Sequence, residues 1–209
     1  KYWAEKFGIN QSTAITCVKP SGTVSQLVDS ASGIHARHNP YYIRTVRGDN
    51  KDPLTEFMRE SGIPNEPDYL KPDHTTVFSF PMMAPKGSVC RHDMTAIEQL
   101  EIWKIYAKHW CEHKPSVTIS VKEDEWVPVG AWCWDNFQYL SGVSFLPFSD
   151  HTYQQAPYQD IDEKEYKKLV KKMPTSIDWQ KLQDYEKEDN TKGSQELACT
   201  AGVCELVDI

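Results

Sequence analysis

One short segment of the chain has the residue types of an anion-binding turn. Residues 15–18 are apolar and strand-like, residues 20–25 read Pro-Ser-Gly-Thr-Val-Ser, and helix-compatible residues follow from Val24. The first N–H groups of a helix have no intrahelical partner and carry a partial positive charge. Glycine lets a ligand approach the backbone closely, and hydroxyl groups donate further hydrogen bonds. The segment therefore predicts a phosphate cradle formed by Ser21, Gly22, Thr23, Val24 and Ser25.

The same spacing also fits a simpler interpretation of this segment. A turn of small polar residues often does no more than start a helix, with a serine or threonine as its N-cap. The segment is not a Walker-type loop, because no Gly-Lys-Ser/Thr sequence closes it. The residues alone leave both interpretations open.

A pair of cysteines near the carboxyl end has the arrangement of a redox couple. Cys199 and Cys204 are separated by four residues, including Gly202, and follow the polar run 185–194. A thiolate exchanges with a disulfide only where it can reach the target sulfur, so a reactive pair on a polar linker favours disulfide exchange. An incidental pair and half of a zinc site are the alternatives. Of the remaining cysteines, Cys17, Cys111 and Cys133 are expected in the core and Cys90 in a loop.

Two further clusters contain side chains that bind metals or anions. His109, Cys111 and His113 lie within one turn of a predicted helix, but no carboxylate or fourth ligand accompanies them, which favours a structural role. The segment 35–38, His-Ala-Arg-His, faces either a polyanion or solvent in a turn before Pro40.

The sequence around the cradle resembles ribonucleotide reductases, above all the monomeric, adenosylcobalamin-dependent (class II) ribonucleoside-triphosphate reductases. The matching blocks follow one another in order along nearly the whole chain. They are residues 20–47 (PSGTVSQLVDSASGIHARHNPYYIRTVR), 114–121 (KPSVTISV), 141–148 (SGVSFLPF), 154–158 (QQAPY) and 199–204 (CTAGVC).

The resemblance implies that the chain is the carboxy-terminal portion of such an enzyme, which reduces ribonucleoside tri- or diphosphates to 2′-deoxyribonucleotides for DNA synthesis by thiyl-radical chemistry. The cofactor implied is adenosylcobalamin, and the cysteine that carries the radical is expected before Lys1. The cradle would bind the substrate phosphates, and thioredoxin or a similar reductant would regenerate Cys199 and Cys204. The resemblance also implies a monomeric full-length enzyme with deoxynucleotide effectors. A metal-dependent class I reductase and a noncatalytic nucleotide- or phosphate-binding module are the alternatives.

The elements that would position these residues alternate between helices and strands. The clearest helix is predicted over residues 96–113, where Thr95 and Glu98 form a capping box and apolar residues recur at spacings of three and four. A strand over 116–121, a helix over 125–139 and a strand over 143–148 predict a parallel βαβ unit. By resemblance, this α/β unit belongs to the carboxy-terminal part of a ten-stranded α/β barrel.

The rest of the chain shows shorter elements and a polar end. Helices are predicted over 2–8, from Val24 to Ser30, over 53–61 and over 162–173, and strands over 15–18, 41–46 and 75–80. From residue 183 the composition turns polar, and such a segment buries too little apolar area to offset its ordering entropy. Two regions are therefore expected: barrel residues 1–182, and a flexible tail, 183–209, that carries the cysteine pair.

Composition excludes several classes of function. The 209 residues carry a net charge of -7, which argues against nonspecific nucleic-acid binding, because that needs a basic face. No apolar run approaches the ~20 residues of a membrane span, so no membrane association is expected. A cytoplasmic location with mostly reduced cysteines is expected.

Overall fold

A computed structural model describes residues 1–22, 24–148, 153–186, 196–200 and 203–207 of the chain. The chain divides into two compact units. The first contains residues 1–40 and 84–151, and the second contains residues 41–83 and 152–209. Among the described residues, no helix is both long enough and apolar enough to cross a membrane.

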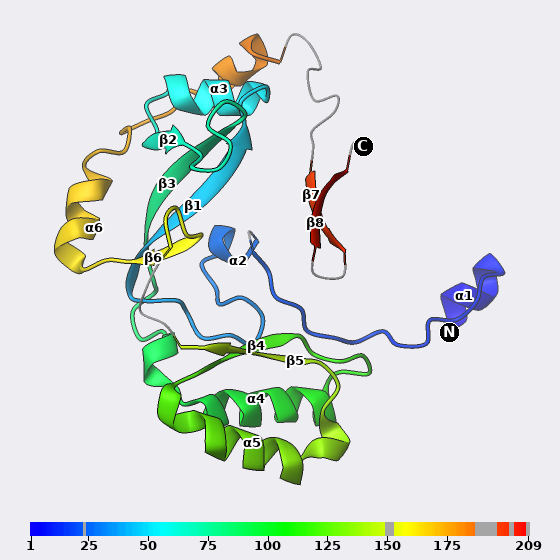
Figure 1. Cartoon of the computed structure of the whole chain (residues 1–209). Coiled ribbons are helices and arrows are strands. Elements are labelled where there is room, and N and C mark those ends of the chain that lie inside the picture. The colour runs from blue at the N-terminus through cyan, green and yellow to red at the C-terminus, as the bar shows by residue number, and fades with distance from the viewer. Residues whose placement is uncertain (23, 149–152, 187–195, 201–202, 208–209) are drawn as a thin grey trace. The chain divides into compact units, whose positions relative to one another are not determined.

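The first unit is built around two parallel strands, β4 and β5 (Figure 1). They pair in register from Val117 opposite Val143 to Val121 opposite Pro147. Parallel neighbours need a crossover connection, and here it is largely helical, as the alternation of the sequence predicts. The elements are β4 (Val117–Val121), η2 (Glu123–Glu125), α5 (Trp126–Asp135), η3 (Phe137–Tyr139) and β5 (Val143–Pro147). The predicted βαβ unit is confirmed, although the described residues do not close a barrel.

Helix α4 (Ala96–His109) packs with α5 on one face of the β4–β5 pair (Figure 1). Its predicted capping box is confirmed, because the Thr95 N–H donates to Glu98 and the Glu98 N–H donates to the Thr95 hydroxyl. The buried core of the unit comes from α4, β4 and α5: Ala96, Leu100, Trp103, Val117, Ile119, Val121, Val129 and Trp132. Such burial of apolar area is the main stabilising contribution to a core of this kind.

The helix predicted to reach His113 ends at His109, because the next residues bind another segment. The Trp110 carbonyl accepts a hydrogen bond from the Thr16 hydroxyl, and the His113 N–H donates to the Thr16 carbonyl. The Ser116 N–H donates to the Val18 carbonyl in the same way. Residues 15–18 therefore run along an irregular turn, and the strand predicted there is not formed.

Two short helices and a 3-10 turn complete the first unit. Helix α1 (Tyr2–Phe7) ends at Gly8, which adopts φ 63°, a left-handed conformation that glycine takes without strain. Helix α2 (Val24–Leu27) has four residues and ends before the predicted Ser30. The 3-10 turn η1 (Arg91–Asp93) precedes α4.

The second unit contains an antiparallel sheet with the strand order β2-β3-β1-β6. Strands β1 and β3 pair over nine residues each, and Figure 1 shows them as a long twisted ribbon. The sequence pattern predicted no strand at β2, which contains Pro67 and pairs with β3 at the edge of the sheet, where proline is tolerated. The bounds are β1 (Tyr41–Asp49), β2 (Asn65–Pro67), β3 (Thr75–Met83) and β6 (Tyr158–Asp160).

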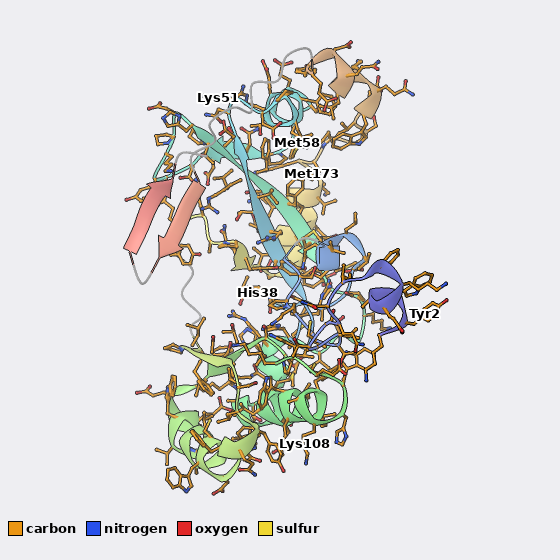
Figure 2. All side chains as sticks on the ribbon, turned by 90° about the vertical axis from the view of Figure 1, so that its right-hand side faces the viewer. Tyr2, His38, Lys51, Met58, Lys108 and Met173 are labelled. Carbon is orange, nitrogen blue, oxygen red and sulfur yellow. The ribbon has the colours of Figure 1, made fainter. Side chains whose placement is uncertain are left out.

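Helices flank this sheet. Lys51 marks the turn from β1 into α3 (Pro53–Glu60), which begins at the N-cap Asp52 (Figure 2). Helix α6 (Glu163–Val170) contacts β1 and β3. The 3-10 segment η4 (Trp179–Asp184) contacts α3, where the Phe57 ring packs against Trp179 at 5.4 Å between centroids. The tail predicted from residue 183 thus begins within η4, and residues 187–195 lie outside the described part.

The carboxyl end forms a two-stranded antiparallel hairpin of β7 (Glu196–Thr200) and β8 (Val203–Val207). Among the described cysteines outside this hairpin, Cys17 departs from expectation: it was expected in the core but is exposed, because the segment that carries it forms no buried strand. Cys90 lies outside the helices and strands, as expected, and is buried, whereas Cys111 and Cys133 are half-buried.

Candidate functional site

The predicted cradle is a turn closed by its own hydrogen bonds. The Ser25 N–H donates to the Ser21 hydroxyl at 3.0 Å, and the Ser25 hydroxyl donates back to the Ser21 carbonyl. Ser25 is 3% exposed, whereas Gly22 and Val24 are exposed and Thr23 lies outside the described residues. The buried Ser25 therefore stabilises the turn through its hydrogen bonds to Ser21. The exposed residues of the predicted cradle are Gly22 and Val24.

Gly22 has open space where a side chain would start. A Cβ atom at this position would meet no other atom within 4 Å. The packing of the described chain therefore does not itself require glycine here. Close approach of a ligand to the backbone is one physical reason for glycine at such a position.

The segment that leads into the cradle is held from two directions. The Lys19 ammonium donates to the Ser116 hydroxyl at 2.9 Å and to the Lys114 carbonyl at 3.3 Å. The backbone of Lys19 contacts Gly33, which has φ 62°, and a Cβ atom at Gly33 would lie 2.9 Å from the Lys19 carbonyl oxygen. The close contact between Gly33 and the Lys19 carbonyl therefore requires glycine at position 33. This role of Gly33 was missed from the sequence, because only the fold shows that Lys19 lies against it.

The cradle is also anchored behind the turn. The Ser21 N–H donates to the Ser32 hydroxyl at 2.8 Å. The His35 ring contacts the Ser32 carbonyl through Nδ1 at 2.7 Å and accepts from the Thr118 N–H through Nε2 at 3.0 Å. Thr118 belongs to β4, so this series of hydrogen bonds connects the cradle to the parallel strands.

Arg37 holds the opposite end of α2. It is 5% exposed, and its guanidinium donates to the Ser30 carbonyl and to the Asp29 carboxylate at 2.7 Å. Asp29 has φ 52°, a left-handed conformation that aspartate tolerates better than most residues. His35 and Arg37 thus bind the protein itself, where the sequence allowed either a polyanion or solvent. His38 lies in the segment that leads into β1 (Figure 2).

The cysteine pair lies in the carboxy-terminal hairpin. Cys199 and Cys204 are register partners across β7 and β8. Opposed residues of an antiparallel pair have Cα atoms roughly 4.5–5.5 Å apart, within the ~4.4–6.8 Å that a disulfide spans. The hairpin therefore gives the two cysteines a backbone separation compatible with a disulfide. Ala201 and Gly202, which connect the strands, lie outside the described residues.

The cluster of His109, Cys111 and His113 was the candidate metal site. Helix α4 ends at His109, so Cys111 and His113 do not continue its surface. Within the part of the chain that the structure describes, no group of three or more His, Cys, Asp or Glu side chains is placed to hold a metal ion.

Comparison with known sequences finds relatives along nearly the whole chain. The chain is 34% identical over 184 residues to a Dictyostelium discoideum protein named probable adenosylcobalamin-dependent ribonucleoside-triphosphate reductase, covering 86% of this chain and 24% of the relative. It is 32% identical over 172 residues to the Euglena gracilis protein named adenosylcobalamin-dependent ribonucleoside-triphosphate reductase, covering 81% of this chain and 24% of the relative. A Lactobacillus acidophilus protein of the same name is 27% identical over 215 residues, covering 99% of this chain and 28% of the relative.

Comparison of folds agrees with comparison of sequences. A crystal structure of a B12-dependent (class II) ribonucleotide reductase matches with a TM-score of 0.71 and 25% identity, over 88% of this chain and 26% of that chain. No protein-family model matches the chain. The chain spans about a quarter of the length of the relatives that it matches.

Proposed function

From the premise that this chain is homologous to a part of the adenosylcobalamin-dependent (class II) ribonucleotide reductases, we propose that it belongs to a longer enzyme of that kind. The full-length protein would reduce ribonucleoside triphosphates, or diphosphates, to 2′-deoxyribonucleotides for DNA synthesis. The observation that carries this proposal is the fold match to a class II reductase over 88% of the chain, which accompanies the sequence matches.

The cradle is proposed to hold the substrate phosphates. Gly22 and Val24 are exposed and Ser21 is half-buried, while Thr23, which the sequence assigns to the same cradle, lies outside the described residues. Ser25 supports the turn from its buried position by its two hydrogen bonds to Ser21. Backbone N–H groups in such a turn stabilise phosphate oxygens by hydrogen bonds and by the orientation of their dipoles.

The hairpin is proposed to carry the cysteine pair that restores the enzyme after each turnover. Reduction of the ribose would convert two other cysteine thiols of the full-length enzyme into a disulfide. The Cys199 and Cys204 thiols would exchange with this disulfide, so that two electrons and two protons pass to it and a disulfide forms in the hairpin. A dithiol protein such as thioredoxin would then reduce the hairpin disulfide in the same way. The match to the L. acidophilus relative covers 99% of this chain and so includes the hairpin segment.

Adenosylcobalamin is the cofactor proposed for the full-length protein, and it supplies the radical that starts catalysis. His35, the histidine beside the cradle, has both ring nitrogens engaged by Ser32 and Thr118. Among the described residues, no group of three or more His, Cys, Asp or Glu side chains is placed to hold a metal ion. We therefore assign no residue of this chain to the cofactor, and propose for the chain itself phosphate binding and thiol exchange.

Further properties of the full-length protein are part of the same proposal. It would act as a monomer in the cytoplasm, with deoxynucleotide effectors and no nucleic-acid partner. Residues 1–182 would contribute to the catalytic barrel, and residues 183–209 would carry the redox pair. The polar linker proposed for that pair falls mainly on residues 187–195, which lie outside the described part of the chain.

The direct test is an assay of the purified full-length protein with ribonucleoside triphosphates and, in parallel, diphosphates. Dithiothreitol serves as the reductant, and adenosylcobalamin is added or omitted. We expect 2′-deoxynucleotides only when adenosylcobalamin is present. Reduction without the cofactor would favour a class I enzyme, and nucleotide binding without reduction would favour a noncatalytic module.

A further inference from the structure

His35 connects the segment behind the cradle to strand β4. Its ring bridges two segments that are distant in sequence, the turn at Ser32 and strand β4 at Thr118. Both partners are backbone groups, a carbonyl on one side and an N–H on the other. Neither partner can rotate away as a side chain would, so the ring is held at both of its nitrogens.

The polarity of these partners determines the state of the ring. A carbonyl oxygen can only accept a hydrogen bond, so Nδ1 must carry a proton. A backbone N–H can only donate, so Nε2 must offer a lone pair to Thr118. The two contacts are met by the tautomer that carries its proton on Nδ1, and neither lysine nor arginine, which offer only donors, could replace His35 at both.

From Ser32 the connection continues into the cradle. The Ser32 hydroxyl accepts the Ser21 N–H at 2.8 Å, and the Ser21 hydroxyl in turn accepts the Ser25 N–H. Thus β4, His35, Ser32 and the cradle form one continuous series of hydrogen bonds. The strand is the rigid member of the series, since its Ile119 and Val121 lie in the buried core.

We propose that His35 is a positioning residue that holds the phosphate cradle in its binding geometry through Ser32. This inference rests on the proposed function of the cradle. A ligand that depends on several backbone N–H groups is sensitive to small displacements of the turn. Loss of the His35 bridge is therefore expected to weaken phosphate binding, while the chemical step, which uses other groups, continues.

The substitutions His35→Asn, His35→Gln and His35→Phe in the full-length enzyme separate the two contacts. The asparagine amide can replace the Nδ1 donor, the glutamine amide can replace the Nε2 acceptor, and phenylalanine keeps only the ring. KM for the ribonucleoside triphosphate should rise roughly tenfold in His35→Phe and about threefold in each amide variant, as expected for two and one lost hydrogen bonds. The value of kcat at saturating substrate should stay within about twofold of the wild type, because only binding is affected.

Ser32→Ala tests the connection by a smaller change. It removes the acceptor for the Ser21 N–H and leaves the Ser32 carbonyl for His35. If the two residues act in one series, the double variant Ser32→Ala/His35→Phe should raise KM about as much as His35→Phe alone, because coupled changes are not additive. Independent, multiplying effects on KM would contradict the proposal, and Ser32→Ala keeps the test available if the His35 variants fold poorly.

Two controls separate this inference from the proposed function. His109→Asn changes an exposed histidine at the end of α4 and should leave KM unchanged. Gly22→Val alters the cradle directly. If Gly22→Val has no effect on substrate binding, the assignment of the cradle as the phosphate-binding site is wrong. If Gly22→Val raises KM but His35→Phe and Ser32→Ala do not, the cradle stands and the positioning role of His35 is wrong.

Discussion

Cys199 and Cys204 lie opposite each other in the antiparallel register of β7 and β8. The sequence shows these cysteines only as a pair separated by four residues, a spacing that fits several structures. The hairpin selects one of these structures: it places the two cysteines opposite each other, and opposed residues of antiparallel strands have the backbone separation of a disulfide. The backbone register of the hairpin is therefore compatible with the redox pair that we propose.

The other cysteines should differ in their reactivity toward thiol reagents. Burial, and then the charge of Asp93, raise the pKa of the Cys90 thiol, and burial raises that of Cys133. The thiolate is the reactive form, so both residues should react slowly at neutral pH and faster as the pH rises. Cys17 is exposed and should react first among the three. Alkylation followed by peptide mass spectrometry measures the order, and faster labelling of Cys90 than of Cys17 would contradict the described burial.

Gly22→Val should weaken substrate binding more than it destabilises the fold. The new side chain would enter the space where phosphate oxygens are proposed to approach the backbone. No described atom lies within 4 Å of the new Cβ, so the thermal midpoint should change little. Substrate affinity and the thermal midpoint of the full-length variant check both parts. Unchanged substrate affinity in a folded variant would exclude phosphate binding by the cradle.

Gly33→Ala is the matched change at the neighbouring glycine, and the opposite result is expected. Gly33 has φ 62°, and an alanine Cβ would lie 2.9 Å from the Lys19 carbonyl oxygen. The left-handed conformation alone costs alanine about 1 kcal/mol, and the contact adds to this cost. Chemical denaturation should show a loss of at least this size. A variant as stable as the wild type would show that the loop does not pack on Lys19.

The Asp68 carboxylate should make the second unit sensitive to acid. Burial alone would raise its pKa, but hydrogen bonds from the Arg47 guanidinium and from the Leu70 and Lys71 N–H groups outweigh burial, and the pKa lies below its ordinary value of 3.8. A pKa lowered by folding stabilises the native state above the ordinary value, and this stabilisation is lost as the pH falls through the lowered value.

Asp68→Asn tests this pH dependence. Near neutral pH, it should lower the free energy of unfolding by about 1–2 kcal/mol, the size expected for hydrogen bonds to a charged group. The difference from the wild type should begin to shrink as the pH falls below about 4, where the Asp68 carboxylate of the unfolded chain takes up a proton, and should go on shrinking until the pH passes the lowered native pKa. Denaturation curves at pH 7 and pH 3 measure both values. A difference that stays constant between these pH values would contradict the role of the charge.

The sequence predicted those elements that its local pattern determines. The capping box at Thr95, the apolar spacing of α4 and the alternation of β4 and β5 all depend on neighbouring residues, and all are confirmed. The strand at 15–18 was predicted wrongly. Its apolar residues fit a strand, but its hydrogen-bond partners come from the irregular turn at 110–116, which no local pattern could reveal.

The support of the candidate site could not be predicted for the same reason. Thr118 is 83 residues from His35, and Lys114 is 95 residues from Lys19. The sequence left open whether His35 faces a polyanion or solvent, and its partners in the structure are backbone groups, which no residue type in the sequence identifies. The turn of the predicted cradle was recognisable, because small residues before a helix are a local feature, and its phosphate-binding role stays a prediction.

Cys199→Ser and Cys204→Ser in the full-length enzyme test most directly whether the hairpin is the re-reducing pair of a reductase. The radical chemistry and the reduction of the ribose are proposed to use other cysteines, so prereduced variants should complete a first turnover. Multiple turnover with thioredoxin should be lost, because one thiol cannot form the disulfide that passes electrons inward. A small dithiol that enters the site directly should restore much of the activity.

The decisive measurement is the yield of 2′-deoxynucleotide per enzyme under two conditions, prereduced enzyme without added reductant and enzyme with excess thioredoxin and its reducing system. Both serine variants are predicted to give about one 2′-deoxynucleotide per enzyme in the first condition, against about two for the wild type, whose reduced Cys199–Cys204 pair supplies a second turnover, and no further product in the second condition, as a relay by thiol exchange requires. Continued thioredoxin-driven turnover by either variant would contradict the assignment of Cys199 and Cys204.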